Sequence, residues 1–121
     1  IEYTKTAFRS LEGNVKRIDA SKCHLFYGDS FEKFALVYEM VKKSKEKTYF
    51  YFDPPFSTRE GMDDIYDKTI ALIESIEPEV AEMVIVEHMS NLEMPEEIGE
   101  MKLTKRKKFG RSTMTYYRAK D

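Results

Sequence analysis

Lys47-Thr48-Tyr49-Phe50-Tyr51-Phe52-Asp53-Pro54-Pro55-Phe56 is an apolar, aromatic run that ends abruptly in an acid and two prolines. The run predicts a buried strand over residues 48–52. Neither proline can donate a ladder hydrogen bond, and both fix φ at about −65°, so the sheet cannot continue through them. We therefore expect Asp53 at the carboxyl end of a strand, where open α/β sheets bind their ligands.

The Asp-Pro-Pro-aromatic corner suits the binding of an exocyclic amino group of a nucleobase. The carboxylate of Asp53 and a backbone carbonyl held before a proline are both acceptors, so together they can take both N–H bonds of the amine. Phe56 is predicted to stack on a base withdrawn from its helix. The alternative is an ordinary Pro-Pro turn that follows a buried strand, with Asp53 as its cap.

The composition is that of one globular domain over residues 1–121. Hydrophobic residues make up 41% and charged residues 35% of the 121-residue chain, which excludes the disordered and membrane classes. The longest apolar run is too short to span a bilayer. The single cysteine, Cys23, cannot form an internal disulfide, and the sequence does not open on a secretory signal pattern. These features predict a cytoplasmic location.

The net charge of −2 conceals a basic cluster near the carboxyl end. Its members are Lys102, Lys105, Arg106, Lys107, Lys108 and Arg111. Such a cluster can neutralise phosphates, which supplies most of the sequence-independent affinity for nucleic acids. The alternative is an edge hairpin whose lysines discourage pairing with other strands.

Alternating strand and helix patterns predict an α/β fold with a Rossmann-like, doubly wound, mostly parallel sheet and an antiparallel hairpin at the end. Asp29 and Ser30 are predicted to cap the second helix, and Met83–Val86 to form a strand buried on both faces. The expected strands are 1–3, 23–27, 48–52, 83–86, 101–109 and 112–118, and the expected helices carry residues 8–18, 31–41 and 65–76.

Four stretches of the sequence match a known family. They are Ile1-Glu2, Tyr27-Gly28-Asp29-Ser30-Phe31, Phe52-Asp53-Pro54-Pro55-Phe56, and a closing motif, Lys108-Phe109-Gly110-Arg111-Ser112-Thr113 followed by Tyr116-Tyr117. With these stretches the chain resembles the later two-thirds of a class I S-adenosylmethionine-dependent methyltransferase, and within that group it is most similar to the bacterial small-subunit ribosomal RNA guanine-N2 methyltransferases. Adenine-N6 and cytosine-N4 enzymes share the Asp-Pro-Pro-Phe motif, whereas the closing motif, with Val86-Glu87 before it, favours the ribosomal branch.

The resemblance implies S-adenosylmethionine as cofactor and ribosomal RNA or the small ribosomal subunit as partner. It does not imply a membrane as a partner. Glu2 would bind the cofactor ribose, and Asp29 with the backbone near Ser30 would meet its adenine. Asp53 and the Pro54-Pro55 corner would hold the target amine, and Phe56 would stack on the flipped guanine. The residues expected to contact RNA are Arg59, Lys105, Arg106, Lys107, Lys108 and Arg111.

In the resembled family, a first strand and a Gly-rich cofactor loop precede the position of Ile1. We therefore expect a truncated methyltransferase that binds cofactor weakly or not at all and is inactive by itself. The sheet edge exposed by truncation predicts self-association, or a shifted sheet in which residues 23–27 pair with residues 48–52.

Two other functions fit the sequence: methylation of adenine-N6 or cytosine-N4 in DNA, and a non-catalytic RNA-binding module of the same fold. No metal site is predicted. Cys23 and His24 face opposite sides of a strand, and His88 has no acid or thiol at a recognisable metal spacing. Glu87 is either a substrate-site acid or a cap partner.

Overall fold

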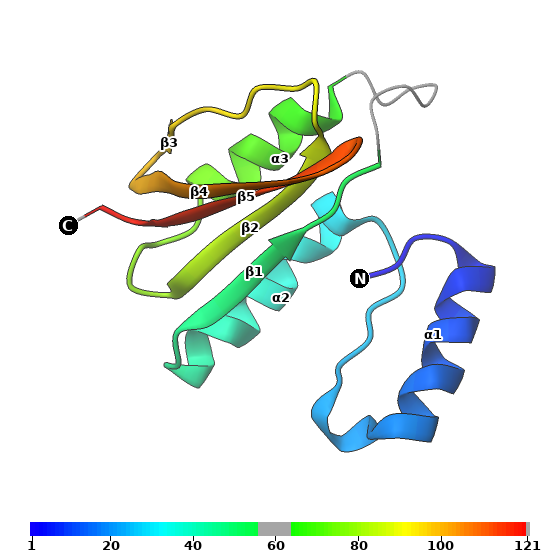
Figure 1. The fold of residues 1–121 in the computed structure, drawn as a ribbon. Helices are drawn as coiled ribbons and strands as arrows, with labels where there is room; N and C mark the ends of the chain where they lie inside the picture. The colour runs from blue at the N-terminus through cyan, green and yellow to red at the C-terminus, as the bar shows by residue number, and fades with distance from the viewer. Residues whose placement is uncertain (56–63, 121) are drawn as a thin grey trace. The chain divides into compact units, whose positions relative to one another are not determined.

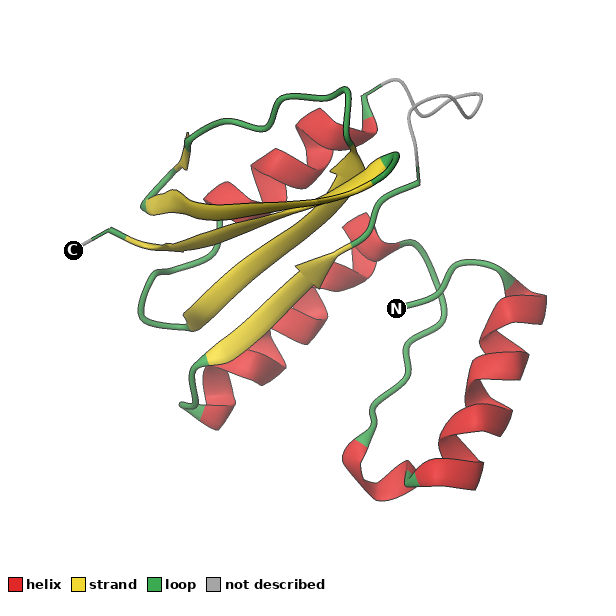
Figure 2. Ribbon diagram, in the orientation of Figure 1, coloured by secondary structure: helices red, strands yellow, loops and turns green. Residues whose placement is uncertain are grey.

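The computed structural model describes residues 1–55 and 64–120. The chain divides into two compact units, Ile1–Lys43 and Ser44–Asp121. Figures 1 and 2 show the helices and strands of both units.

The first unit contains the helix α1 (Lys5–Ile18), a 3-10 turn (η1, Ala20–Lys22) and most of the helix α2 (Ser30–Ser44). The predicted strand over residues 23–27 is wrong, because this segment makes only a single parallel bridge, Glu2 with Tyr27. The chain before it turns into α1 at Lys5, which leaves too few extended residues to form a ladder. The ring of Tyr27 packs edge-on against Phe8 of α1, with centroids 5.4 Å apart.

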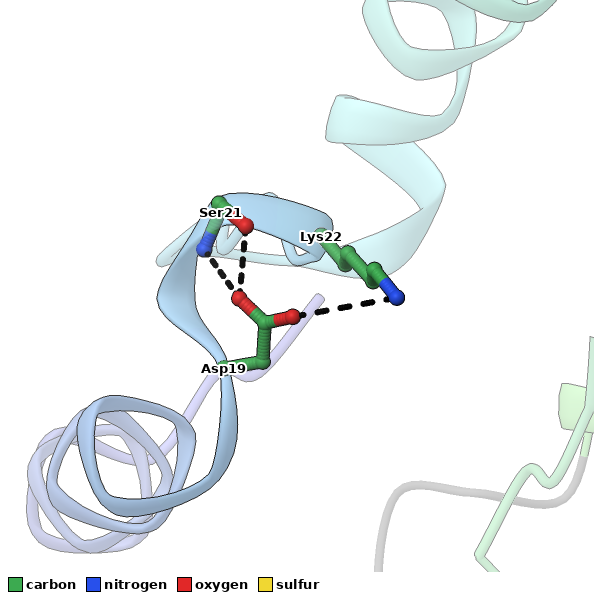
Figure 3. A network of polar contacts seen from close by, with 3 residues as sticks. All are labelled: Asp19, Ser21 and Lys22. Carbon is green, nitrogen blue, oxygen red and sulfur yellow. Dashed lines mark hydrogen bonds and ion pairs between the residues drawn. The ribbon is translucent and has the colours of Figure 1, made fainter.

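Asp19 orders the turn after α1. Its Oδ1 accepts hydrogen bonds from the backbone N–H of Ser21 at 3.0 Å and from the hydroxyl of Ser21 at 2.6 Å (Figure 3). Its other oxygen lies 3.9 Å from Nζ of Lys22. An Asp that accepts from the backbone two residues on is a common way to close a tight turn.

The second unit is built on a five-stranded sheet in the order β1-β2-β5-β4-β3. Strands β1 and β2 are parallel, with the helix α3 between them in sequence, and the other neighbours are antiparallel. The predicted α/β class and closing hairpin are confirmed, while the sheet of this unit is mixed rather than mostly parallel. The elements are β1 (Thr48–Phe52), α3 (Ile65–Glu74), β2 (Ala81–Met89), β3 (Glu97–Ile98), β4 (Met101–Phe109) and β5 (Ser112–Ala119).

The core of this unit lies between α3 and one face of the sheet (Figure 1). Within the predicted strand, Val84 and Val86 are buried whereas Met83 and Ile85 are half-buried, so the prediction of full burial is confirmed for one face of β2. Strand β1 is an edge strand in which Phe50 is buried but Tyr49 is 63% and Tyr51 53% exposed. Among the described residues of this unit, β1 pairs with β2 along one side.

A tight hairpin joins β4 to β5 through Gly110, whose φ of +63° favours glycine. The hydroxyl of Ser90, just after β2, donates to the carbonyl of Gly110 at 2.9 Å and ties the turn to the end of β2. None of the helices that the structure describes has the length and apolar character needed to cross a membrane.

Candidate active site at the carboxyl ends of β1 and β2

Asp53 follows the last residue of β1, and Pro54 and Pro55 follow it with their rings half-buried. Phe52 is in register with Val86 of the parallel strand β2. The next residues along the two strands are Asp53 and Glu87. The prediction that Asp53 lies at the carboxyl end of a strand is confirmed, and the neighbouring strand brings a second carboxyl group to the same edge.

Tyr51 connects the two strands at this edge. Its hydroxyl donates a hydrogen bond to Oε1 of Glu87 at 2.6 Å. That bond, followed by burial and by the charges of Glu87 and Asp53, raises the pKa of Tyr51 to about 12. The phenol therefore stays protonated through the physiological range and holds the glutamate in place.

Asp53 is exposed, yet its pKa is raised above the ordinary aspartate range. The larger cause is the loss of solvent around the carboxyl group, and the smaller is the negative charge of Glu87. A carboxyl group with a raised pKa binds protons more readily than an ordinary aspartate and is suited to take a proton from a ligand.

The raised pKa of Asp53 predicts that its charge destabilises the fold. A group whose pKa is higher in the folded than in the unfolded state contributes stability below the unfolded value, and that contribution is lost as the pH rises through the folded value. Asp53→Asn is therefore expected to increase the free energy of unfolding at pH 7. The gain should vanish below about pH 4, near the ordinary aspartate pKa. Urea denaturation across this pH range measures it, and a variant less stable than wild type at pH 7 would contradict the prediction.

Buried groups fix the end of β2 from the opposite side of the strand. His88, 2% exposed, places Nε2 2.7 Å from the hydroxyl of Thr115 and Nδ1 2.8 Å from the carbonyl of Met89. Because a carbonyl only accepts, Nδ1 carries the proton and Nε2 accepts from Thr115. The hydroxyl of Tyr66 on α3 accepts the backbone N–H of Met89 at 3.3 Å. These contacts give His88 a structural role and fix the backbone next to Glu87.

Glu2 and Asp29, the predicted cofactor residues, lie together in the first unit. The bridge between Glu2 and Tyr27 sets them at the ends of two adjacent extended segments, and the N–H of Gly28 donates to the carbonyl of Glu2 at 2.9 Å. Oε1 of Glu2 accepts the N–H of Thr4 at 3.0 Å, and Oδ1 of Asp29 accepts the N–H of Phe31 at 2.8 Å. The second bond confirms that Asp29 caps α2, which begins at Ser30.

These contacts use one carboxylate oxygen of Glu2 and one of Asp29. Both side chains are half-buried. Paired carboxylates of this kind fit the hydroxyl groups of a ribose and the amine of an adenine, which are hydrogen-bond donors. The carboxylate acceptors of the first unit are thus compatible with the adenosine part of S-adenosylmethionine.

The basic residues of β4 lie on two faces of the sheet. Lys105 and Lys107 are in register with Tyr116 and Met114 of β5, on the face of Tyr51 and Glu87. Nζ of Lys105 lies 5.9 Å from the ring centroid of Tyr116, and Nζ of Lys107 lies 5.3 Å from that of Phe109.

The remaining cations of the cluster differ from this pair. Arg106 and Lys108 are in register with the buried Thr115 and Thr113, on the α3 face. Arg106 donates from Nη2 to the carbonyl of Met94 at 3.2 Å, so it holds the segment after β2. Arg111 lies in the hairpin turn, where its carbonyl accepts the N–H of Ser90 at 2.7 Å. The structure thus divides a cluster that is continuous in the sequence.

Two predicted site residues, Phe56 and Arg59, lie outside the described residues. Sequence reasoning also missed the role of Tyr51, which it placed only within a buried strand over residues 48–52. The alternation of side-chain direction along a strand carries the relevant signal, because Tyr51 and Asp53 are two residues apart and so share a face.

Among residues 1–55 and 64–120, no group of three His, Cys, Asp or Glu side chains is arranged to hold a metal ion.

A family model described as "Conserved hypothetical protein 95" matches residues 1–118 of the sequence. The chain belongs to this family. No curated protein gave a significant match. The fold resembles three solved structures: a conserved hypothetical protein from Streptococcus pyogenes, with 17% identity and a TM-score of 0.63; the proposed methyltransferase yhhF from Escherichia coli, also with 17% and 0.63; and a proposed methylase from Haemophilus influenzae, with 16% and 0.59.

These alignments cover 97%, 97% and 98% of this chain and 68%, 59% and 63% of the respective solved chains. The sequence thus spans about two thirds of the length of the structures it resembles. At these identities the likeness shows the fold, and the fold is that of the proteins described as methyltransferases.

Proposed function

We propose that this chain is part of an S-adenosylmethionine-dependent methyltransferase that modifies the exocyclic N2 amine of a guanine in small-subunit ribosomal RNA. The observation that carries the proposal is the Asp53-Pro54-Pro55 corner at the carboxyl end of β1, with Glu87 beside it on β2. Membership of the family and the fold of the solved relatives support it.

In this proposal, Glu2 and Asp29 bind the ribose and adenine of the cofactor, which supplies an activated methyl group when bound. Asp53 and the backbone carbonyl at the Pro54 corner accept the two N–H bonds of the target amine, which leaves the nitrogen lone pair free to attack.

Asp53 also accepts the proton that the target amine loses in this proposal. The amine nitrogen gains a methyl group and becomes acidic, and it must lose one proton to give the neutral product. The carboxylate that already accepts an N–H bond is placed to take that proton as the new C–N bond forms. Its raised pKa increases its affinity for the proton.

The test is methyl transfer by the protein in its natural full-length form. Small ribosomal subunits and their extracted RNA, from cells that lack the gene, are incubated with tritiated S-adenosylmethionine and digested to nucleosides. The expected product is N2-methylguanosine. N6-methyladenine or N4-methylcytosine in a DNA substrate would favour the second enzyme class, and RNA binding without any transfer would favour the non-catalytic module.

Lys105 and Lys107 are expected to contact RNA phosphates, because they lie on the face of Tyr51 and Glu87. Replacing both by Gln should reduce the slope of log Kd against log salt by about one unit for each lost phosphate contact. Filter binding between 50 and 300 mM salt, about the range over which such slopes are resolved, measures the effect.

The matched control is Lys108→Gln, which removes one charge from the same strand on the opposite face. Its slope is expected to stay at the wild-type value, in contrast to the expectation from the sequence that Lys108 also contacts RNA. If the double variant kept the wild-type slope, these lysines would have the alternative role of protecting a sheet edge.

A further inference from the structure

Glu87 is the second carboxyl group of this site. The proposed binding of the amine by Asp53 and the backbone carbonyl does not use it. It continues the register of β1 and β2 beyond the pair Phe52 and Val86, so it lies beside Asp53. It is half-buried, and Tyr51 donates to its Oε1 at 2.6 Å. One oxygen is thus held by the phenol, while Oε2 has no hydrogen-bond partner among residues 1–55 and 64–120 and is an available acceptor there.

The amine-binding corner alone does not select one base. Guanine, adenine and cytosine each carry an exocyclic amine that could occupy it. They differ at the ring nitrogen next to that amine: guanine has an N1–H donor, whereas adenine has a lone pair at N1 and cytosine has a lone pair at N3. A second carboxylate beside the corner meets a hydrogen-bond donor only with guanine and meets a lone pair with the other two bases.

We propose that Glu87 accepts the N1–H of the target guanine while Asp53 holds its N2 amine, so that the site selects guanine over adenine and cytosine. The inference rests on the proposed function and adds the residue that determines its base specificity. Tyr51 is a positioning residue, because it acts through its bond to Glu87.

The geometry supports this role over a structural cap. The bond partner of Glu87 is a side chain on the neighbouring strand, 36 positions away, and that side chain is 53% exposed. The buried contacts that fix the end of β2 come instead from His88 and Tyr66 on the other face. Glu87 is therefore held on the same face as the ring of Tyr51.

The test uses 2-aminopurine riboside at the position of the methylated guanosine, which partial ribonuclease digestion of the tritiated RNA into sequenced fragments locates. This base keeps the 2-amine but has a lone pair at N1 and no oxygen at C6. The full-length protein is assayed for kcat/KM on both RNAs. Because the missing oxygen affects every variant alike, the readout is the change in the guanine to 2-aminopurine ratio, not the ratio itself.

Glu87→Gln is expected to lower this ratio by roughly 10- to 100-fold, since one charge-assisted hydrogen bond is lost with guanine and the amide can donate to N1 of 2-aminopurine. Tyr51→Phe should lower the ratio by a smaller factor. The first control is Glu82→Gln at the amino end of β2, where Oε1 of Glu82 lies 3.4 Å from Nη1 of Arg118. The second is Tyr49→Phe, on the same face of β1 as Tyr51. Both should keep the wild-type ratio.

The outcomes separate the two proposals. Wild-type protein that forms N2-methylguanosine, with a ratio unchanged in both Glu87→Gln and Tyr51→Phe, would overturn the role of Glu87 and leave the proposed function standing. Wild-type protein that forms no N2-methylguanosine would overturn both. If Glu87→Gln does not fold, Tyr51→Phe decides, because it removes a single exposed hydroxyl group.

Discussion

Asp53→Ala in the full-length protein is expected to lower kcat for methyl transfer by about 10²- to 10⁴-fold, the range typical of a lost group that orients a reactant and accepts its proton. The fold should remain intact, because the side chain lies beyond the end of β1 and its charge does not stabilise the folded state. Single-turnover transfer from tritiated S-adenosylmethionine measures the chemical step, and thermal unfolding checks the fold.

Asp53→Asn is the matched variant for this prediction. The amide keeps one acceptor oxygen and can hold an N–H bond, but it cannot take up the proton. Its rate should lie between those of Asp53→Ala and wild type. Activity of Asp53→Ala within a few-fold of wild type would show that the corner is only a turn. A large loss of cofactor affinity would place Asp53 in the cofactor pocket instead of the amine site.

The predictions that depend on local chemistry were confirmed by the structure. Two prolines in succession end a strand whatever surrounds them, so Asp53 lies where the sequence indicates. Asp29 caps α2 because an Asx side chain binds the backbone two residues on without help from distant parts of the chain. The glycine between two β-rich stretches likewise forms the antiparallel hairpin of β4 and β5.

The predictions that depend on neighbours were less accurate. The aromatic run over 48–52 indicates a strand, but only the sheet order reveals that β1 lies at an edge and exposes Tyr49 and Tyr51. Hydrophobicity alone likewise marks Met83–Val86 as apolar without telling which face is covered. The pairing of Tyr51 with Glu87 spans 36 positions and follows from register, which no local pattern determines.

Tyr117→Ala is expected to be the most destabilising single change in the second unit, by about 3–5 kcal/mol. Tyr117 is 0% exposed and lies on β5, in register with Val84 of β2 on one side and Leu103 of β4 on the other. Its hydroxyl donates to the carbonyl of Pro95 at 2.6 Å, and burial raises its pKa to about 12. Truncation therefore leaves a large cavity in the core beside β5. It also leaves the carbonyl of Pro95, in the segment that follows β2, without this hydrogen bond.

Tyr117→Phe separates these two contributions. The ring remains and fills the core, so only the hydrogen bond to Pro95 is lost, at a cost of about 1–2 kcal/mol. Urea denaturation monitored by far-UV circular dichroism gives both free energies, and the difference between the variants measures the packing of the ring. Equal losses in the two variants would mean that the bond to Pro95, rather than the ring, holds β5 in the sheet. Losses below about 1 kcal/mol in both variants would contradict the placement of Tyr117 at the centre of the core, since removal of a buried ring of this size rarely lowers the free energy of unfolding by so little.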